Sequence, residues 1–181
     1  MKSATPSLIL LDCQRDQVTD PDGRIAPENQ AVIKRLSGLL QHARSAGWTV
    51  CHCQFAGDGP VSAREPLDRL RPNAREPVFV RRGLSAFSDS YFNQVLARSA
   101  GRTCLLAGFS APFSVLATVF DARTRGHELT VVPEAVGSLP VEPRSVEETR
   151  AMAFDLIGRL APILPWEQMA ERWLREPAEV I

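Results

Sequence analysis

The sequence lacks the features that mark membrane-bound and nucleic-acid-binding proteins. Its 181 residues carry 21 Lys and Arg against 21 Asp and Glu, so the formal net charge is zero, and no polybasic run appears. The first apolar run covers only residues 7–11, which is too short for a signal peptide or a membrane span. We therefore expect a cytoplasmic protein that binds neither nucleic acid nor membranes.

Cysteine and histidine are also scarce. The four cysteines are Cys13, Cys51, Cys53 and Cys104, and each lies in or beside an expected buried strand, as is typical of free thiols in a reducing compartment. Cys51-His52-Cys53 contains metal-ligand residue types, but neighbours along a strand point to opposite faces, and no second pair completes four ligands. We expect neither a metal nor another cofactor.

Alternating strand and helix patterns indicate the fold class. With 44% hydrophobic residues, the chain can bury the core of one domain over residues 1–181. The pattern predicts an α/β fold of three α-β-α layers, Rossmann-like, around an open, mostly parallel, six-stranded sheet. The expected strands are 7–12, 48–54, 78–80, 103–107, 128–133 and 162–164. The first expected helix begins at Pro27 and stops at Gly47, and the four others span 88–100, 113–125, 147–160 and 166–175. Residues 56–77 form a long excursion of the kind that often walls a pocket.

Polar groups follow three of the expected strands. Asp12 and Arg81 each end one, and the third turns at Gly108 into a helix that restarts near Pro112, with Ser114 in its first turn. The carboxyl ends of parallel strands share one edge, where open α/β sheets place their ligand sites. The first N–H groups of a helix can stabilise a developing negative charge beside a nucleophile. The alternatives are a plain strand–helix unit with a solvated serine, and an aspartate that only caps its turn.

Four segments together resemble one family. Leu10–Asp16 contains Asp-x-Gln-x-Asp, Val80–Phe87 ends in Ser-Ala-Phe, Leu106–Ala122 covers the strand–Gly–helix turn, and Arg125–Ser138 covers the next strand and loop. On these motifs the chain is identified as similar to the isochorismatase-like hydrolases, also called the cysteine hydrolase superfamily. The resemblance covers nearly the whole chain.

The resemblance implies a catalytic Asp, Lys and Cys. Asp12 matches the aspartate, whereas Arg81 stands at the lysine position and Ser114 at the cysteine position. It also implies a cis peptide between Phe109 and Ser110, with the backbone N–H groups of Ser110 and Ser114 as oxyanion donors. A serine hydroxyl is a far weaker acid than a thiol and needs a dedicated base, and no histidine has an obvious claim to that role.

Arginine at position 81 changes the site's chemistry. It keeps the positive charge, never gives up a proton, and favours two-pronged contact with a carboxylate. It could pair with Asp12 and hold it ionised, or clamp a carboxylate of the substrate. We therefore expect a small, anionic substrate.

A second branch of the resembling family, the true isochorismatases, works without the cysteine. These enzymes hydrolyse a vinyl ether with the aspartate as general acid and with a glutamine from the end of the second strand, a position that Gln54 matches. The resemblance therefore favours vinyl-ether hydrolysis with Asp12 as the general acid or base. Phe87, Phe109 and Phe113 are candidates for an apolar pocket wall, or for core packing.

Two other functions remain open from the sequence. One is a catalytically degenerate member that binds a small molecule or serves as a scaffold, which a buried Asp12–Arg81 pair without a cavity would favour. The other is a serine-dependent amidase or esterase, with Ser114 as nucleophile. The resemblance also suggests a homodimer or homotetramer, with Trp166–Ile181 as a candidate contact surface.

Overall fold

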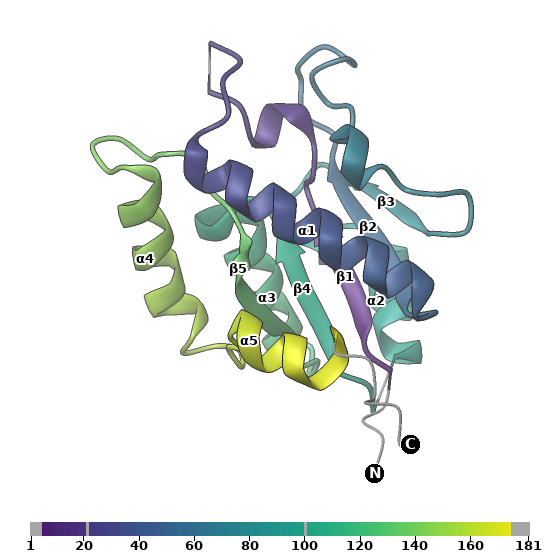
Figure 1. Ribbon diagram of the computed structural model, residues 1–181. Coiled ribbons are helices and arrows are strands. Elements are labelled where there is room, and N and C mark those ends of the chain that lie inside the picture. The colour runs from purple at the N-terminus through teal and green to yellow at the C-terminus, as the bar shows by residue number, and fades with distance from the viewer. Residues whose placement is uncertain (1–4, 21, 100, 175–181) are drawn as a thin grey trace, which may run out of the picture.

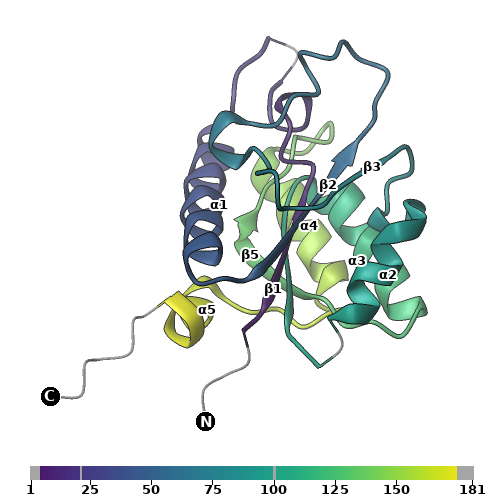
Figure 2. The same cartoon turned by 90° about the vertical axis from the view of Figure 1, so that its right-hand side faces the viewer.

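A single parallel sheet lies between two helical layers. The computed structural model describes residues 5–20, 22–99 and 101–174. The strands run in the order β3-β2-β1-β4-β5, and α1 and α5 cover one face while α2, α3 and α4 cover the other (Figures 1 and 2). The strands are β1 (Ser7–Leu11), β2 (Thr49–Phe55), β3 (Val78–Arg81), β4 (Cys104–Gly108) and β5 (Thr130–Val136). The helices are α1 (Pro27–Ser45), α2 (Ser90–Arg98), α3 (Leu116–Thr124), α4 (Val146–Ile157) and α5 (Trp166–Met169). The expected α/β class with an open parallel sheet is confirmed.

The described part of the chain forms five strands rather than the six expected. The segment at 162–164 meets β5 only through an isolated bridge between Ile163 and Val131. Two backbone hydrogen bonds join this segment to Val131: the Val131 N–H donates one of them, and the Val131 carbonyl accepts the other. Pro162 has no N–H with which to extend the ladder, so the segment stays a contact rather than a strand. β5 itself continues to Val136, past the expected end at Pro133, because the β4–β5 pairing shifts register between Leu106 and Gly108.

β1 is the central strand because it is apolar on both faces. Ile9 and Leu11 pack into the core beneath α2, α3 and α4, whereas Leu8 and Leu10 pack beneath α1 and α5. A strand buried on both faces needs a continuous apolar run, which residues 8–11 supply. Among the described residues, no helix is long and apolar enough to cross a membrane.

The helix ends follow local capping chemistry. α1 begins at Pro27, and the chain leaves it through Gly47 at φ 69°. The cap of α2 is Asp89, whose side chain accepts the Tyr91 N–H, so the helix begins at Ser90 rather than at residue 88 as expected.

The last two helices are shorter than the sequence pattern indicated. α4 begins with a capping box between Ser145 and Glu148 and ends at Ile157 rather than at residue 160. α5 is followed by a π-helical turn over Ala170–Leu174. Met169 is fully buried, and Trp166 packs partly buried against the core under α1, whereas the charged and polar residues between them and after them are mostly exposed. The expected oligomer surface at 166–181 stays a prediction. Residues 175–181 lie outside the described residues.

Residues 56–77 are irregular, as expected, apart from a short turn at Asp68–Leu70. Contacts along its length fix this excursion to the rest of the fold, including backbone hydrogen bonds between residues 13–16 and 63–67. Near its start, the Gln14 amide donates to the carbonyls of Phe55 and Arg64, at 3.0 and 2.8 Å. At its end, the Glu76 carboxylate accepts from three side chains, Arg44, His52 and Asn73.

The Glu76 cluster joins a buried carboxylate and a buried imidazole to the partly exposed Arg44. Arg44 binds both carboxylate oxygens at 2.7 Å, and His52 Nε2 lies 2.9 Å from Oε2. Burial alone would raise the pKa of Glu76, but hydrogen bonds from Arg44, the Asn73 N–H and His52 lower it to about 2. Burial lowers the pKa of His52, so the imidazole is neutral at neutral pH and donates to the carboxylate. His52 therefore has a structural partner, on the strand face opposite to Cys51 and Cys53.

We predict that Glu76→Gln lowers the free energy of unfolding at neutral pH by about 2 kcal/mol, because Arg44 loses its charged partner. The folded-state pKa of Glu76 lies below the ordinary 4.5, so its stabilisation is complete above pH 4.5 and is lost as pH falls towards 2. Urea unfolding across this range should show the two proteins converging at low pH.

Glu65→Gln is the matched control. Glu65 pairs with Arg71 at the surface, where both side chains are nearly half exposed, so the change should cost less than about 1 kcal/mol. A difference between wild type and Glu76→Gln that does not shrink with falling pH would contradict the role assigned to the cluster.

Candidate active site

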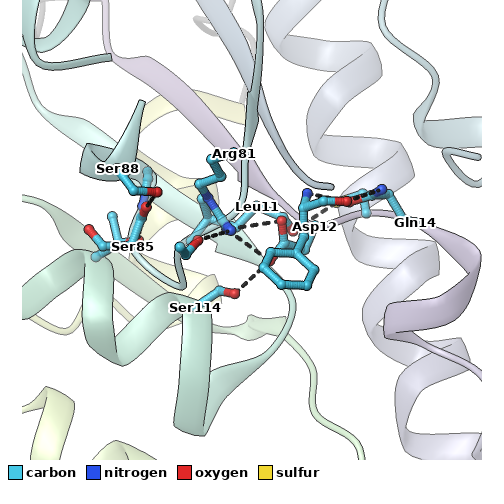
Figure 3. A network of polar contacts seen from close by, with 12 residues as sticks. Leu11, Asp12, Gln14, Arg81, Ser85, Ser88 and Ser114 are labelled. Atoms are coloured by element: carbon cyan, nitrogen blue, oxygen red, sulfur yellow. Dashed lines mark hydrogen bonds and ion pairs between the residues drawn. The ribbon is translucent and has the colours of Figure 1, made fainter. Parts of the chain in front are cut away.

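Three polar side chains meet at the carboxyl edge of the sheet. Asp12 follows β1, Arg81 ends β3, and Ser114 lies in the turn after β4. Arg81 Nη2 donates to both Asp12 oxygens, Oδ1 at 3.0 Å and Oδ2 at 2.8 Å. The Ser114 hydroxyl donates to Asp12 Oδ2 at 2.5 Å. Figure 3 shows the arginine and the serine pointing at the aspartate from different elements, so the convergence expected from the sequence is present.

The backbone around Asp12 is shaped to bring these groups together. Asp12 has φ 46°, a left-handed conformation that aspartate tolerates better than most residues. Gly108 has φ 120°, and a Cβ there would lie 2.1 Å from the Leu11 carbonyl oxygen. The Phe109 N–H donates to that same carbonyl at 2.9 Å. Only glycine therefore lets the turn after β4 approach the end of β1 this closely.

The turn that carries Ser114 contains the cis peptide implied by the resemblance, between Phe109 and Ser110. It continues as one π-helical turn over Ala111–Val115 before α3, where the sequence pattern indicated an ordinary helix start. Single π turns inside helices are frequent at functional sites. Ser110 is nearly buried, and its role with Ser114 as an oxyanion donor stays a prediction.

A support that sequence reasoning missed lies behind this turn. The Asn29 side chain donates to the Ser138 carbonyl at 2.7 Å and accepts the Ser138 N–H at 3.2 Å. Gly137 accepts the Ala111 N–H at 2.9 Å, and a Cβ on Gly137 would lie 2.1 Å from the Phe109 ring. The sequence did offer one signal of this support, because Asn29 is a polar residue on the otherwise apolar face of α1.

Burial governs the electrostatics of the site. The Asp12 and Arg81 side chains are 0% exposed, and Ser114 is 4% exposed. Burial raises the pKa of Asp12 above its usual range, while Arg81 and the Ser114 hydrogen bond pull it partly back. Arg81 Nη1 donates to the Gly83 carbonyl at 2.8 Å. Of the two roles open to Arg81, the structure shows the pairing with Asp12, while its Nε has no hydrogen-bond partner among the described residues and the role as a substrate clamp stays a prediction.

Gln54 is not brought to Asp12. Cys53 lies in the core beneath α2 and α3, and the Phe55 ring lies 5.8 Å from the Arg81 guanidinium carbon. Since successive residues of a strand alternate, Gln54 lies on the opposite face, half-buried. Phe55 is thus a neighbour of the site that the sequence reasoning overlooked, although strand pairing places it directly beside Arg81.

The expected phenylalanine wall does not form as a unit. Phe87 is buried in the core, where its ring stacks on His127 and packs edge-on against Phe92. Phe109 is fully buried beneath α1. Phe113 is 48% exposed and lines an apolar hollow beside α3. For Phe87 and Phe109 core packing is the outcome, because both side chains fill the layers next to the sheet.

A hollow of about 560 Å³ lies close to the site at the same edge of the sheet. Its lining consists of Arg15, Asp16, Thr19, Asp20, Gly23, Ala63 and Leu139, and so includes one residue of the 56–77 excursion. Asp16 raises the pKa of Asp12 electrostatically, so the hollow and the site are neighbours. The lining does not include Asp12, Arg81 or Ser114, and access to these groups from this side requires movement of the residues that cover them.

No histidine serves Asp12. His42 packs against Trp48, His52 contacts Glu76, and His127 contacts Asn93. Within residues 5–20, 22–99 and 101–174, no group of three or more His, Cys, Asp or Glu side chains could hold a metal ion. The four cysteines are free and buried, and burial raises the pKa of each thiol, to about 12 for Cys51.

We predict that Arg81→Met lowers the free energy of unfolding at neutral pH by about 3 kcal/mol, because Asp12 stays buried without an opposite charge. Loss of the guanidinium raises the pKa of Asp12 further. A raised folded-state pKa gives stability that is present at low pH and is lost as pH rises, so the deficit should be larger at ~pH 8 than at ~pH 5. Urea unfolding at both pH values measures it.

Arg82→Met is the control for this change, since Arg82 is exposed on the same segment. It should shift the free energy of unfolding by less than about 0.5 kcal/mol at either pH. An Arg81→Met protein as stable as wild type at the higher pH would show that the ion pair does not hold the site together.

Comparisons with known proteins identify the family of the chain and agree with its fold. The isochorismatase domain matches residues 6–168 of this chain. The maleamate amidohydrolase of Pseudomonas putida KT2440 is 28% identical over 88% of this chain and 82% of its own, and the secreted isochorismatase effector Isc1 of Verticillium dahliae is 25% identical over 72% and 71%. The crystal structure of an isochorismatase from P. putida KT2440 superposes with a TM-score of 0.77 at 22% identity, covering 91% of both chains. The chain therefore belongs to the isochorismatase family of hydrolases.

Proposed function

We propose that this protein hydrolyses an amide or ester bond of a small molecule, with Ser114 as the nucleophile and Asp12 as its base. The observation that carries the proposal is the 2.5 Å hydrogen bond from the Ser114 hydroxyl to Asp12 Oδ2. A nucleophile within hydrogen-bonding reach of a base that a third group orients is the arrangement of covalent catalysis, and Arg81 is the orienting group here.

The reaction would proceed in two acyl-transfer steps. Ser114 Oγ bonds to the carbonyl carbon while its proton passes to Asp12. The bond from that carbon to the amine or alcohol then breaks as Asp12 gives the proton to the leaving group, and the acyl–serine ester remains. Water attacks the acyl group next, Asp12 accepts the proton of that water, and the proton returns to Ser114 Oγ as the acid leaves. Asp12 ends as it began, so protons balance over the cycle.

The environment suits Asp12 to this work. A carboxylate with a raised pKa is a stronger base towards a hydroxyl than an ordinary surface aspartate. Arg81 neutralises the buried charge but does not release protons at accessible pH, so Asp12 alone carries the transfer. The amidohydrolase among the relatives supports amide cleavage as the reaction class.

Vinyl-ether hydrolysis with Asp12 as a general acid is the second candidate. The raised pKa of Asp12 favours it, because a carboxyl that holds its proton more tightly can protonate a substrate near neutral pH. Gln54 lies on the opposite face of its strand, which removes one of the arguments for vinyl-ether hydrolysis. In this case Ser114 would be a bystander.

The complete burial of Asp12 and Arg81 favours a third function, a family member that binds or scaffolds without turnover. Both oxygens of Asp12 are already hydrogen-bonded to Arg81, and one also to Ser114. A proton acceptor in that state works only if substrate binding rearranges the site. The panel experiment below separates this function from the other two.

We predict that Asp12→Asn lowers kcat/KM on amide or ester substrates by about 100- to 10,000-fold, since it removes the acid–base group. Ser114→Ala should cause a loss of similar size if the serine is the nucleophile. Purified wild type and variants would be assayed on a panel of small amides, esters and vinyl ethers that includes both maleamate and isochorismate. Asp22→Asn, an exposed aspartate in a turn, is the matched control and should keep full activity.

The panel outcomes lead to different conclusions. Turnover of a vinyl ether that needs Asp12 but survives in Ser114→Ala would contradict the acyl-transfer proposal and favour the second candidate. Full activity in Asp12→Asn would exclude both mechanisms. Absence of turnover across the panel would favour the binding or scaffold function.

A further inference from the structure

One backbone donor in the turn after β4 has no partner. The Ser110 N–H makes no hydrogen bond with any residue that the structure describes, although Ser110 is only 7% exposed. The N–H groups on both sides of it are used. The Phe109 N–H donates to the Leu11 carbonyl at 2.9 Å, and the Ala111 N–H donates to the Gly137 carbonyl at 2.9 Å. Buried N–H groups without a partner are rare in native proteins, so this donor is left for an acceptor from outside the chain.

The position of this donor suits the carbonyl oxygen of a substrate that Ser114 attacks. That oxygen becomes negatively charged as the carbon becomes tetrahedral, and backbone N–H groups held in place stabilise the charge. Ser110 is tied to the residue after Ser114, because its carbonyl accepts the Val115 N–H at 3.1 Å. The direction of the Ser110 N–H matters for the rate, since a misplacement of about 1 Å can cost ~100-fold.

Gly137 holds the turn on both sides of Ser110. Its N–H donates to the Gly108 carbonyl at 3.0 Å, and its carbonyl accepts the Ala111 N–H. The turn cannot rotate about Ser110 without breaking one of these two bonds. A Cβ on Gly137 would lie 2.1 Å from the Phe109 ring, so this close support requires glycine.

Asn29 of α1 fixes the residue that follows Gly137. Its Nδ2 donates to the Ser138 carbonyl at 2.7 Å, and its Oδ1 accepts the Ser138 N–H at 3.2 Å, so one side chain binds both backbone groups of one residue. Asn29 is 0% exposed and lies on the face of α1 that also buries Val32 and Leu36. An amide in such a place is costly unless it is paired, and the contact with Ser138 pairs it.

We propose that Asn29 is a positioning residue for catalysis, which directs the Ser110 N–H at the developing oxyanion through Ser138 and Gly137. The inference rests on the proposed acyl transfer at Ser114. Both hydrogen bonds of the Asn29 side chain go to Ser138 and none goes to Asp12, so Asn29 acts on the oxyanion and not on the proton transfer. Its loss slows the chemical step and leaves substrate binding nearly unchanged.

Two variants of Asn29 test this role on an amide or ester that wild type turns over. Asn29→Leu keeps most of the side-chain volume but removes both hydrogen bonds, and Asn29→Ala removes the volume as well. Each should lower kcat by about 10- to 100-fold and leave KM within about threefold of wild type. A merely structural role would reduce the amount of folded enzyme and leave kcat per active site unchanged. Complete titration with a fluorophosphonate counts the active sites, and circular dichroism establishes that the variants fold.

A boronic acid that carries the acyl part of the same substrate gives a readout independent of turnover. Its boron bonds to Ser114 Oγ while the serine proton passes to Asp12, and an oxygen of the tetrahedral boronate takes the place of the oxyanion. The planar product acid forms no such adduct. Both Asn29 variants should bind the boronic acid more weakly by about the factor lost in kcat, and the product acid with unchanged affinity.

Thr149→Val is the matched control. Thr149 is also 0% exposed, and its hydroxyl accepts the Val141 N–H at 3.2 Å, in the same loop as Ser138 but outside the contacts of Gly137. The change removes a buried hydrogen bond between a side chain and the backbone, as the Asn29 variants do. It should leave kcat, KM and the affinity for the boronic acid within about twofold of wild type.

Several results would overturn the inference while the proposed function stands. They are a kcat per active site in the Asn29 variants that equals wild type, an equal loss in Thr149→Val, and a rise in KM that accounts for the whole loss in kcat/KM. A wild type that neither turns over a substrate nor labels at Ser114 would overturn the proposed function and this inference with it. That case is recognised from wild type alone, so the two failures are distinguishable.

Discussion

The structure depends on one buried ion pair, between Asp12 and Arg81. Two charges without solvent exposure are tolerated only when they neutralise each other and most of their hydrogen-bonding groups find partners; here only Arg81 Nε, among the described groups of the pair, has none. Arg81 therefore binds both aspartate oxygens and the Gly83 carbonyl, and Ser114 donates to one of those oxygens. The ends of three strands must be placed accurately for this, which explains the left-handed backbone at Asp12 and the close approach of Gly108.

Much of this arrangement could be predicted from the sequence, because it follows from the topology of parallel sheets. A doubly apolar strand must be central, and the residues that follow parallel strands must share an edge, so Asp12, Arg81 and Ser114 were expected to converge. The cis peptide before Ser110 came from the resemblance alone. The predicted number of strands and the predicted helix ends were wrong where a single residue decides the outcome. Pro162 is an example, because it prevents a sixth strand.

Side-chain direction was the part that sequence reasoning could not supply. Gln54 was expected in the site, yet one step along a strand reverses the face, and its neighbour Phe55 lies over Arg81 instead. Phe87 and Phe113 are both aromatic residues near the site's segments, but one fills the core and the other is half exposed. Burial depends on what packs against a residue, and that is a property of distant segments such as α4.

The most direct test of the account is whether Asp12 activates Ser114. The measurement is intact-protein mass spectrometry with peptide mapping after treatment with a small acylating ester or a fluorophosphonate. The account predicts one adduct, on Ser114, that forms in wild type and is absent in Asp12→Asn. Equal labelling of Ser114 in both proteins, or turnover of substrate by a protein that never labels at Ser114, would contradict it.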